Sequence, residues 1–319
     1  MPTHRSDSVK VACAVAAGAA VGFAVARRYC AARSTAQRQS SQSTRRTKVP
    51  AQFIEEQLAR NRAFFGDEGQ DRVMNSRVVV FGAAGPGSHC AHMIARSGVL
   101  HLLIVDTSDI THSDVATNAL ARQGDVGLGA GDVLRKYCET FSNASIQVKR
   151  LPRGHIKSIL EEFAPDVVID CLPPTTELSS KLELLRACIQ LNISTTSLMT
   201  TSRKADPTRV RVGPLGSVRG DPAACLLQRT LLDDAAKSND ANKAENAQPQ
   251  DAFGRIDVVS SCESLPLTES AGDSVDNSPA MACVFGMALA SKCLCDLASS
   301  PVRIFVNDPL RASLKTREV

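Results

Sequence analysis

The sequence has few aromatic residues. It contains no tryptophan and two tyrosines, and aromatic residues make up 4% of its 319 positions. Proteins that bind single-stranded nucleic acid by stacking bases on side chains depend on aromatic residues, so the composition argues against that class. Hydrophobic residues nevertheless make up 43% of the chain, which permits a full core. The length allows one large α/β domain or two small domains.

The sequence also lacks paired cysteines. None of its eleven cysteines forms a Cys-x-x-Cys pair, and the closest two are Cys293 and Cys295. A structural zinc site needs four ligands in paired spacings, so we expect no metal ligands among them. Buried, reduced cysteines of an intracellular protein are the favoured interpretation.

Acidic residues are nearly absent from the first 50 positions. This segment carries nine Lys or Arg and a single acid, Asp7, which gives it a net charge of +8. Because the whole chain has a net charge of +4, the remaining residues sum to −4. Residues 31–49 are rich in Arg, Ser, Gln and Thr and have no apolar period, a pattern typical of a flexible basic linker.

An uncharged apolar stretch precedes this linker. Residues 11–26 carry no charge and are flanked by Lys10 and by Arg27 and Arg28. As a helix they would span about 24 Å, slightly less than the hydrocarbon core of a bilayer, so we extend the predicted transmembrane anchor to residues 9–30. The short span and basic flanks favour the mitochondrial outer membrane with the body of the protein in the cytosol. A cleaved secretory signal and a mitochondrial presequence are the alternatives.

The rest of the chain, residues 50–319, alternates strand-like and helix-like segments. Such alternation predicts a doubly wound α/β domain with a mostly parallel sheet and helices on both faces. We interpret residues 232–252 as a polar surface insertion. The expected strands are Val78–Phe81, Leu102–Val105, Ser145–Arg150, Val167–Asp170 and Ile193–Leu198. The expected helices are Phe53–Phe65, Ser88–Ser97, Val133–Phe141, His155–Phe163, Leu178–Leu191 and Ala280–Ala298.

A glycine-rich turn follows the first expected strand. Gly82, Gly85 and Gly87 lead into a helix, and Asp106 ends the next apolar run. This is the layout of a nucleotide-binding βαβ unit, in which the helix N-terminus faces phosphate and the acid binds a ribose hydroxyl. Ligands then bind outside the carboxyl ends of the strands. An NAD-dependent oxidoreductase would share these features.

The order of several further motifs narrows the choice. Over roughly residues 52–300 the sequence resembles the ThiF/MoeB superfamily of adenylating enzymes, which is related to ubiquitin-activating enzymes. Within it, the sequence is most similar to the tRNA threonylcarbamoyladenosine dehydratases. The oxidoreductase alternative does not explain the later motifs. The segments that carry the resemblance are Arg60–Gly69, Asn75–Gly82, Gly87–Gly98, Asp206–Val210, Gly220–Ala223, Val258–Glu263 and Asn277–Ala290.

The resemblance implies an activity, a set of ligands and partners. Relatives bind ATP with Mg²⁺ and adenylate a carboxylate, which in the dehydratases belongs to the threonylcarbamoyl group on adenosine in the tRNA anticodon loop, and cyclisation follows. By position, Gly82, Gly85 and Gly87 match the phosphate-binding turn and Asp106 the ribose-binding acid. Arg60 matches an arginine that reaches phosphate, often across a dimer interface. We therefore expect a homodimer or a heterodimer with a ThiF-type homologue.

The phosphate side departs from the family pattern. Ala84 replaces the middle glycine of the turn, Pro86 replaces a valine, and Ala116-Thr117 stand where relatives have Asn-Arg. Ala130 occupies the position of the family's lysine and Pro173 that of its metal-binding acid. Arg122 is the one nearby residue that could substitute for the missing arginine, whereas Lys136 lies too far along the chain.

Other polar residues have plainer interpretations. We interpret His89 and His92 as packed or surface residues. Cys171 is expected to be buried, and Cys262 is not expected to act as a thioester-forming nucleophile. The basic cluster could contact tRNA phosphate or form a solvated face. Its members are Arg203, Lys204, Arg209, Arg211 and Arg219.

Two hypotheses follow. The first is an ATP-dependent tRNA threonylcarbamoyladenosine dehydratase with altered phosphate contacts. The second is a catalytically inactive paralogue that acts as a scaffold or regulatory subunit of an active homologue. Losing a single electrostatic stabiliser of a transition state commonly costs about 3 kcal/mol. Because the family's arginine, lysine and metal-binding acid are all replaced, the second hypothesis is favoured for the activity of the protein. The first hypothesis still describes its evolutionary origin.

Overall fold

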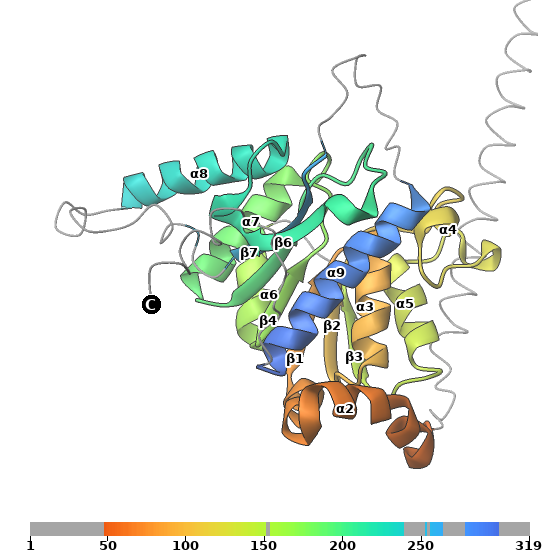
Figure 1. Ribbon diagram of the computed structural model, residues 1–319. Coiled ribbons are helices and arrows are strands. Elements are labelled where there is room, and N and C mark those ends of the chain that lie inside the picture. Colours follow the sequence, from red (N-terminus) through yellow and green to blue (C-terminus); the bar gives the residue numbers. More distant parts are fainter. Residues whose placement is uncertain (1–47, 151–153, 239–252, 254–255, 264–277, 300–319) are drawn as a thin grey trace, which may run out of the picture. The chain divides into compact units, whose positions relative to one another are not determined.

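The computed structural model describes residues 48–150, 154–238, 253, 256–263 and 278–299. In this part of the chain, strands form a single sheet in the order β3-β2-β1-β4-β5-β7-β6. Neighbouring strands are parallel except β6, which runs antiparallel to β7. The predicted doubly wound, mostly parallel sheet is confirmed (Figure 1). The strands are β1 (Arg77–Phe81), β2 (His101–Val105), β3 (Ser145–Lys149), β4 (Val167–Asp170), β5 (Ser194–Leu198), β6 (Val210–Pro214) and β7 (Ile256–Ser261).

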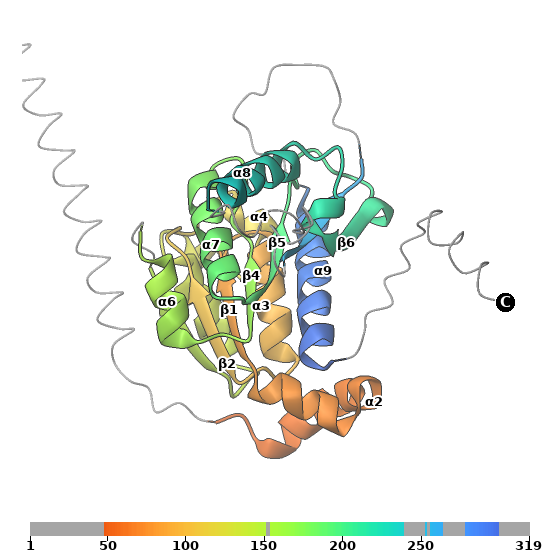
Figure 2. The same cartoon turned by 90° about the vertical axis from the view of Figure 1, so that its left-hand side faces the viewer.

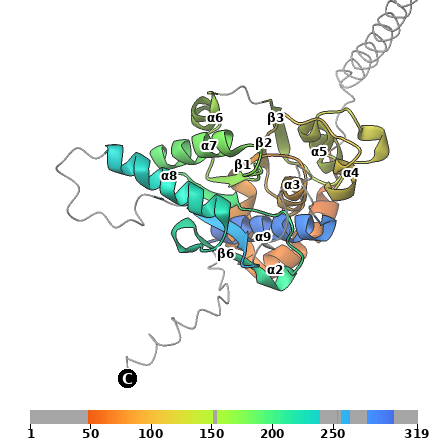
Figure 3. The ribbon, with the colours of Figure 1, turned by 90° about the horizontal axis from the view of Figure 1, so that it is seen from above.

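Helices cover both faces of the sheet. The side chains of α3, α5 and α9 pack on one face, and those of α6 and α7 pack on the other. Figures 2 and 3 show α6 and α7 on one side of the strands and α9 on the other. The helices are α2 (Ala51–Asn75), α3 (Pro86–Arg96), α4 (Asp114–Thr117), α5 (Ala130–Cys138), α6 (Ile156–Phe163), α7 (Leu178–Gln190), α8 (Pro222–Ser238) and α9 (Pro279–Leu297), with short 3₁₀ turns η1 (Gln123–Asp125), η2 (Pro207–Arg209) and η3 (Leu215–Ser217).

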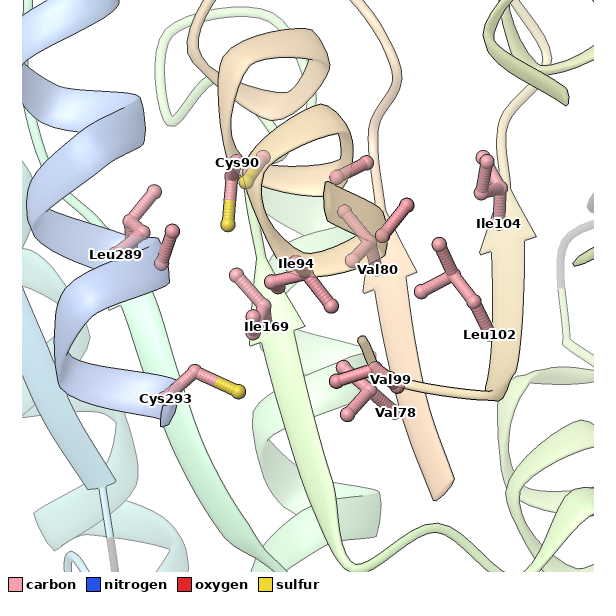
Figure 4. Close-up of a cluster of buried hydrophobic side chains, with 14 of the residues drawn as sticks. Val78, Val80, Cys90, Ile94, Val99, Leu102, Ile104, Ile169, Leu289 and Cys293 are labelled. Atoms are coloured by element: carbon pink, nitrogen blue, oxygen red, sulfur yellow. The ribbon is translucent and has the colours of Figure 1, made fainter. Parts of the chain in front are cut away.

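The central strand β1 is buried on both faces. Val78 and Val80 point to the face covered by α3 and α9, and Val79 and Phe81 point to the opposite face. This explains why its sequence reads as a continuous apolar run rather than an alternating one. Each fully buried side chain of this size stabilises the fold by roughly 1.5–3 kcal/mol. Figure 4 shows the buried side chains on the face of Val78 and Val80, between α3, α9 and the strands.

The helix α9 lies where the sequence predicts the helix Ala280–Ala298. It packs against α3 so closely that a Cβ at Gly286 would lie 2.5 Å from the Pro86 carbonyl oxygen. Among the described helices, α9 alone is long and apolar enough to cross a membrane, and half of its most apolar stretch is buried within the protein. Phe285 and Leu289 are fully buried in the core, so we treat α9 as a core helix.

The helix α2 lies beneath the sheet at the amino ends of its strands (Figure 1). The Gln57 side chain donates to the Arg96 carbonyl and the Asn61 side chain to the Ser97 carbonyl, at the C-terminal end of α3. The element is longer than the predicted Phe53–Phe65 because it continues beyond a kink at Gly66, where φ is +74°. A positive φ is easily adopted only by glycine.

Several expectations change. The sequence interpretation missed β6, β7 and α8, and it placed residues 232–238 in a polar insertion although they form the end of α8. Residues 239–252 lie outside the described part. The predicted anchor at residues 9–30 lies outside it as well, as does the predicted linker except for its last two residues, so both remain predictions.

Candidate functional site

The sheet has one topological switch point. β1 pairs with β2 on one side and with β4 on the other, so the connections after β1 and β4 leave in opposite directions. In open α/β sheets this arrangement creates a crevice outside the carboxyl ends of the strands. The glycine turn after β1 lies at this point.

Close packing requires glycine at position 87 and leaves little room at Gly82. A Cβ at Gly87 would lie 2.0 Å from the Gly82 carbonyl oxygen, and a Cβ at Gly82 would lie 3.0 Å from the Cys171 carbonyl oxygen. Gly82 and Gly85 have positive φ values of +89° and +43°. A Cβ at Gly85, in contrast, would contact nothing within 4 Å, so the backbone at Gly85 has free space beside it.

The start of α3 presents backbone N–H groups. Gly85 precedes the helix and Pro86 is at its first position, where the missing N–H of proline removes no helical hydrogen bond. Ser88 closes the turn, because its N–H and Oγ both donate to the Gly85 carbonyl oxygen, at 3.1 and 2.6 Å. Among the described residues, the N–H groups of Ala84 and Gly85 have no acceptor. Free N–H groups at a helix N-terminus form an anion-binding site.

Asp106 fixes this turn to the end of β2. Its Oδ2 accepts from the Ala83 N–H at 2.5 Å, and its Oδ1 accepts from the N–H and Oγ of Ser108, both at 2.6 Å. Burial raises the pKa of Asp106 above its ordinary value, although these hydrogen bonds and the charge of Arg150 oppose the increase. A carboxylate offers about four acceptor sites, so one remains for a ribose hydroxyl.

The nearby cations have partners elsewhere. The Arg122 guanidinium stacks on the Tyr137 ring at 4.7 Å, so it does not take the place of the missing arginine. Lys136 pairs with Asp125 at 3.1 Å. Arg150 pairs with Asp109, three residues after Asp106. The positive charge expected for a triphosphate is therefore not supplied by these side chains.

The end of β4 holds a buried ion pair that sequence reasoning missed. The Asp170 Oδ2 accepts from Lys181 Nζ at 2.5 Å and from Ser197 Oγ at 2.6 Å, and its Oδ1 accepts from the Leu172 N–H at 3.0 Å. Asp170 and Lys181 are both fully buried. The available signal was a lysine on a helix that follows a buried strand ending in an acid.

The residues at this position do not fit a protein-bound Mg²⁺. Magnesium prefers carboxylate oxygens in open octahedral geometry, but Asp170 is enclosed and already bonded to a lysine ammonium group. Pro173 is exposed and has no ligand atom in its side chain. In the described part of the chain, no group of three or more His, Cys, Asp or Glu side chains could hold a metal ion.

The histidines of α3 are packing residues, as interpreted. His89 Nε2 donates to the Thr117 carbonyl oxygen at 3.1 Å, and the His92 ring meets the Phe141 ring edge-on. Burial lowers the pKa of both, and for His92 to about 4. Cys171 is buried, and Cys262 is exposed.

Arg60 is not part of the site of its own chain. It is exposed on α2, whose Gln57 contacts the C-terminal end of α3, whereas the glycine turn lies at the N-terminal end of the same helix. The structure therefore brings Gly82, Gly85, Gly87 and Asp106 together and leaves Arg60 at the opposite edge of the sheet.

These features agree with the comparison to known proteins. Residues 58–291 match the ThiF family. The chain belongs to the ThiF family. Two relatives are tRNA threonylcarbamoyladenosine dehydratases 2 and 1 of Saccharomyces cerevisiae, 29% identical over 185 residues and 25% identical over 264 residues. The alignments cover 56% and 79% of this ThiF chain, but only 40% and 60% of the yeast proteins.

A bacterial relative and solved structures extend the comparison. The tRNA threonylcarbamoyladenosine dehydratase of Bacillus subtilis is 29% identical over 184 residues, which cover 57% of this chain and 71% of the relative. The solved structure of TcdA (CsdL) superposes with a TM-score of 0.66 at 19% identity, covering 79% of this chain and 98% of TcdA. Escherichia coli TcdA in complex with ATP superposes with a TM-score of 0.65 at 18% identity, covering 77% of this chain and 95% of that one. These structures establish the ThiF fold.

Proposed function

We propose that this ThiF protein is an ATP-dependent tRNA threonylcarbamoyladenosine dehydratase. The observation that carries the proposal is the joint geometry of the glycine turn and Asp106 at the switch point of the sheet. Gly87 is packed too tightly for any side chain, Gly82 combines a tight contact with a positive φ, and Asp106 is bonded directly to the turn. The relatives named tRNA threonylcarbamoyladenosine dehydratase supply the substrate class.

The proposed reaction has two steps. A carboxylate oxygen of the threonylcarbamoyl group attacks the α-phosphorus of ATP, a P–O bond forms, and pyrophosphate leaves. A nucleophile of the same modified group then attacks the activated acyl carbon, loses its proton, and expels AMP. The net change in the tRNA is the loss of one water.

The chain's own residues would bind and orient ATP. The free N–H groups of Ala84 and Gly85 and the start of α3 would hold phosphate oxygens, and Asp106 would accept from a ribose hydroxyl. Arg122, Lys136 and Arg150 are engaged elsewhere, so these three described cations do not neutralise the triphosphate. We propose that the protein works as a dimer in which Arg60 of one copy reaches the site of the other.

An assay with the purified full chain tests the proposal. ATP, Mg²⁺ and tRNA bearing threonylcarbamoyladenosine are supplied, and the nucleosides are analysed by mass spectrometry for the loss of one water. ATP–pyrophosphate exchange reports the first step separately. The Asp106→Ala variant serves as control and should lose both signals. Absence of both signals from the wild-type chain, with activity restored by a second ThiF homologue, would establish the inactive paralogue instead.

We also propose that residues 9–30 anchor the protein in the mitochondrial outer membrane and leave the body in the cytosol. The support is the uncharged stretch with its basic flanks. The test is alkaline carbonate extraction of mitochondria containing the full chain, followed by protease treatment of intact mitochondria. Release into the soluble fraction, or protection from the protease, would contradict this location.

A further inference from the structure

The segment between β5 and α8 carries an exposed set of arginines, Arg203, Arg209, Arg211 and Arg219, which we call the arginine surface. Residues 51–319 have a net charge of −4, so the positive arginine surface is opposite in sign to the rest of this part of the chain. Clusters of one sign on a body of the other sign indicate a charged partner.

Three of the four arginines, Arg203, Arg209 and Arg211, lie towards the same edge of the sheet as the glycine turn. Val210, the first residue of β6, pairs with Ser261, the last residue of β7, so Arg209 is at the carboxyl edge. Arg203 lies in the loop that follows the carboxyl end of β5. The chain returns to this edge at Asp221, which accepts from the N–H and Oγ1 of Thr200. Arg219 is two residues before that contact, but its guanidinium group is held at Gly216, nearer the amino end of β7.

Two of these arginines are held in place without losing their charge. Arg211 Nη1 donates to the carbonyl oxygens of Thr208 and Val210 at 2.6 and 3.0 Å. Arg219 Nη1 repeats the arrangement with Gly216 and Val218, at 2.7 and 2.9 Å. Carbonyl oxygens orient a guanidinium group but do not neutralise it. A group that is ordered before binding loses less entropy when a ligand arrives.

The acidic side chains in this region already have hydrogen-bond or ion-pair partners. Asp221 is buried and accepts from Thr200, Ala223 and Ala224. Glu263 accepts from the N–H groups of Ala205 and Asp206. Arg209 pairs with Asp206 at 3.3 Å. Among the described residues, Arg203, Arg211 and Arg219 make no ion pair with a carboxylate.

We propose that the arginine surface binds the phosphate backbone of the tRNA substrate and holds the RNA at the edge of the sheet where the glycine turn lies. The inference rests on the proposed function for the identity of the polyanion. Arginine suits this partner because its planar group donates to two phosphate oxygens at once. Binding of this kind releases counterions and weakens steeply with salt.

The experiment compares two double variants of the full chain. Arg211→Ala with Arg219→Ala removes two unpaired charges of the arginine surface. Arg135→Ala with Arg186→Ala is the matched control, because each of those arginines pairs with a carboxylate, Asp132 or Asp234. The dissociation constant for modified tRNA is measured over a range of salt concentrations, and ATP affinity is measured in parallel.

We expect the first double variant to bind tRNA about tenfold more weakly at 0.1 M salt, with a salt slope smaller by about 1.5. ATP affinity should stay unchanged, and the KM for tRNA should rise while kcat holds. Lysine at both positions should recover part of the binding. Equal losses of tRNA affinity in both double variants, or no loss in the first, would overturn the proposed role of the arginine surface. The activity of the wild-type chain tests the proposed function separately. Loss of binding to phosphatidylserine vesicles with unchanged tRNA binding would overturn it as well.

Discussion

Lys181 Nζ and Asp170 Oδ2 lie 2.5 Å apart in a place where neither side chain is exposed. The pair joins α7 to the end of β4, and Ser197 adds a link to β5. Asp170 also holds the Leu172 N–H, next to the Cys171 carbonyl that packs against Gly82. The buried ion pair thus holds in place the segment Cys171–Leu172, which packs against the glycine turn.

Removing one member of this pair should be costly. Lys181→Met leaves the Asp170 carboxylate buried without its counter-charge, and we expect a loss of about 3–5 kcal/mol in the free energy of unfolding. Urea denaturation measures it. Lys149→Met is the control, because that lysine pairs with the exposed Glu162 and should cost at most about 1 kcal/mol. Similar losses for both variants would contradict the structural role of the pair.

The turn should not tolerate a methyl group at Gly87. Gly87→Ala would place a Cβ 2.0 Å from the Gly82 carbonyl oxygen, so the backbone of the turn must move. We expect ATP binding to be lost and the melting temperature to fall. Gly124→Ala is matched in chemistry, but its Cβ would meet nothing within 4 Å, and its effect should stay within about 0.5 kcal/mol. Wild-type ATP affinity in Gly87→Ala would place the ligand elsewhere.

His92 should make the protein less stable in acid. Burial, helped by the charges of Arg96 and His89, lowers the pKa of His92 to about 4, whereas an unfolded histidine titrates near about 6.5. The unfolded chain therefore takes up the proton first, and stability falls as the pH drops from about 6.5 to about 4. His92→Phe should flatten this part of the stability curve.

Chemical denaturation at several pH values measures the effect. Since His92 is only half-buried, we expect a difference of about 1–2 kcal/mol across this range. Replacement of the exposed His101 by Gln controls for loss of an imidazole. If the loss of stability between about pH 6.5 and about pH 4 is unchanged in His92→Phe, His92 is not its cause.

Arg60 should act in trans if two copies share a site. Arg60→Ala and Asp106→Ala would each be inactive alone. In a mixture, half of the dimers are mixed, and each mixed dimer holds one complete site, so about a quarter of wild-type activity should return. Refolding or co-expression of the two variants, followed by the dehydration assay, provides the test. Full activity of Arg60→Ala by itself would exclude this role.

The βαβ units were predictable because their signals are local. The apolar run of β1 and the glycine turn occur in one short stretch, and the position of Asp106 follows from their spacing. β6 and β7 were missed because β6 depends on pairing with β7, across more than 40 residues of sequence, and β7 also depends on pairing with the distant strand β5. The end of α8 reads as low complexity, with Asp233 and Asp234 followed by two alanines, yet Leu227 and Leu231 bury its other face.

The site was predictable in part for a similar reason. Gly82, Gly85, Gly87 and Asp106 belong to one motif, and the structure brings them together. Lys181 was missed because lysine is normally a surface residue, and its partner Asp170 is eleven positions away on another element. Arg122 could not be judged from spacing, since its direction depends on stacking against Tyr137.

The contact between Gly286 and the Pro86 carbonyl also sets the order in which the protein can mature during synthesis. The helix that follows the glycine turn is covered by a helix encoded almost 200 residues later. Until α9 leaves the ribosome, the apolar side chains of α3 that face it stay exposed and available to chaperones. The part of the fold that carries the glycine turn is therefore finished only after α9 has been synthesised.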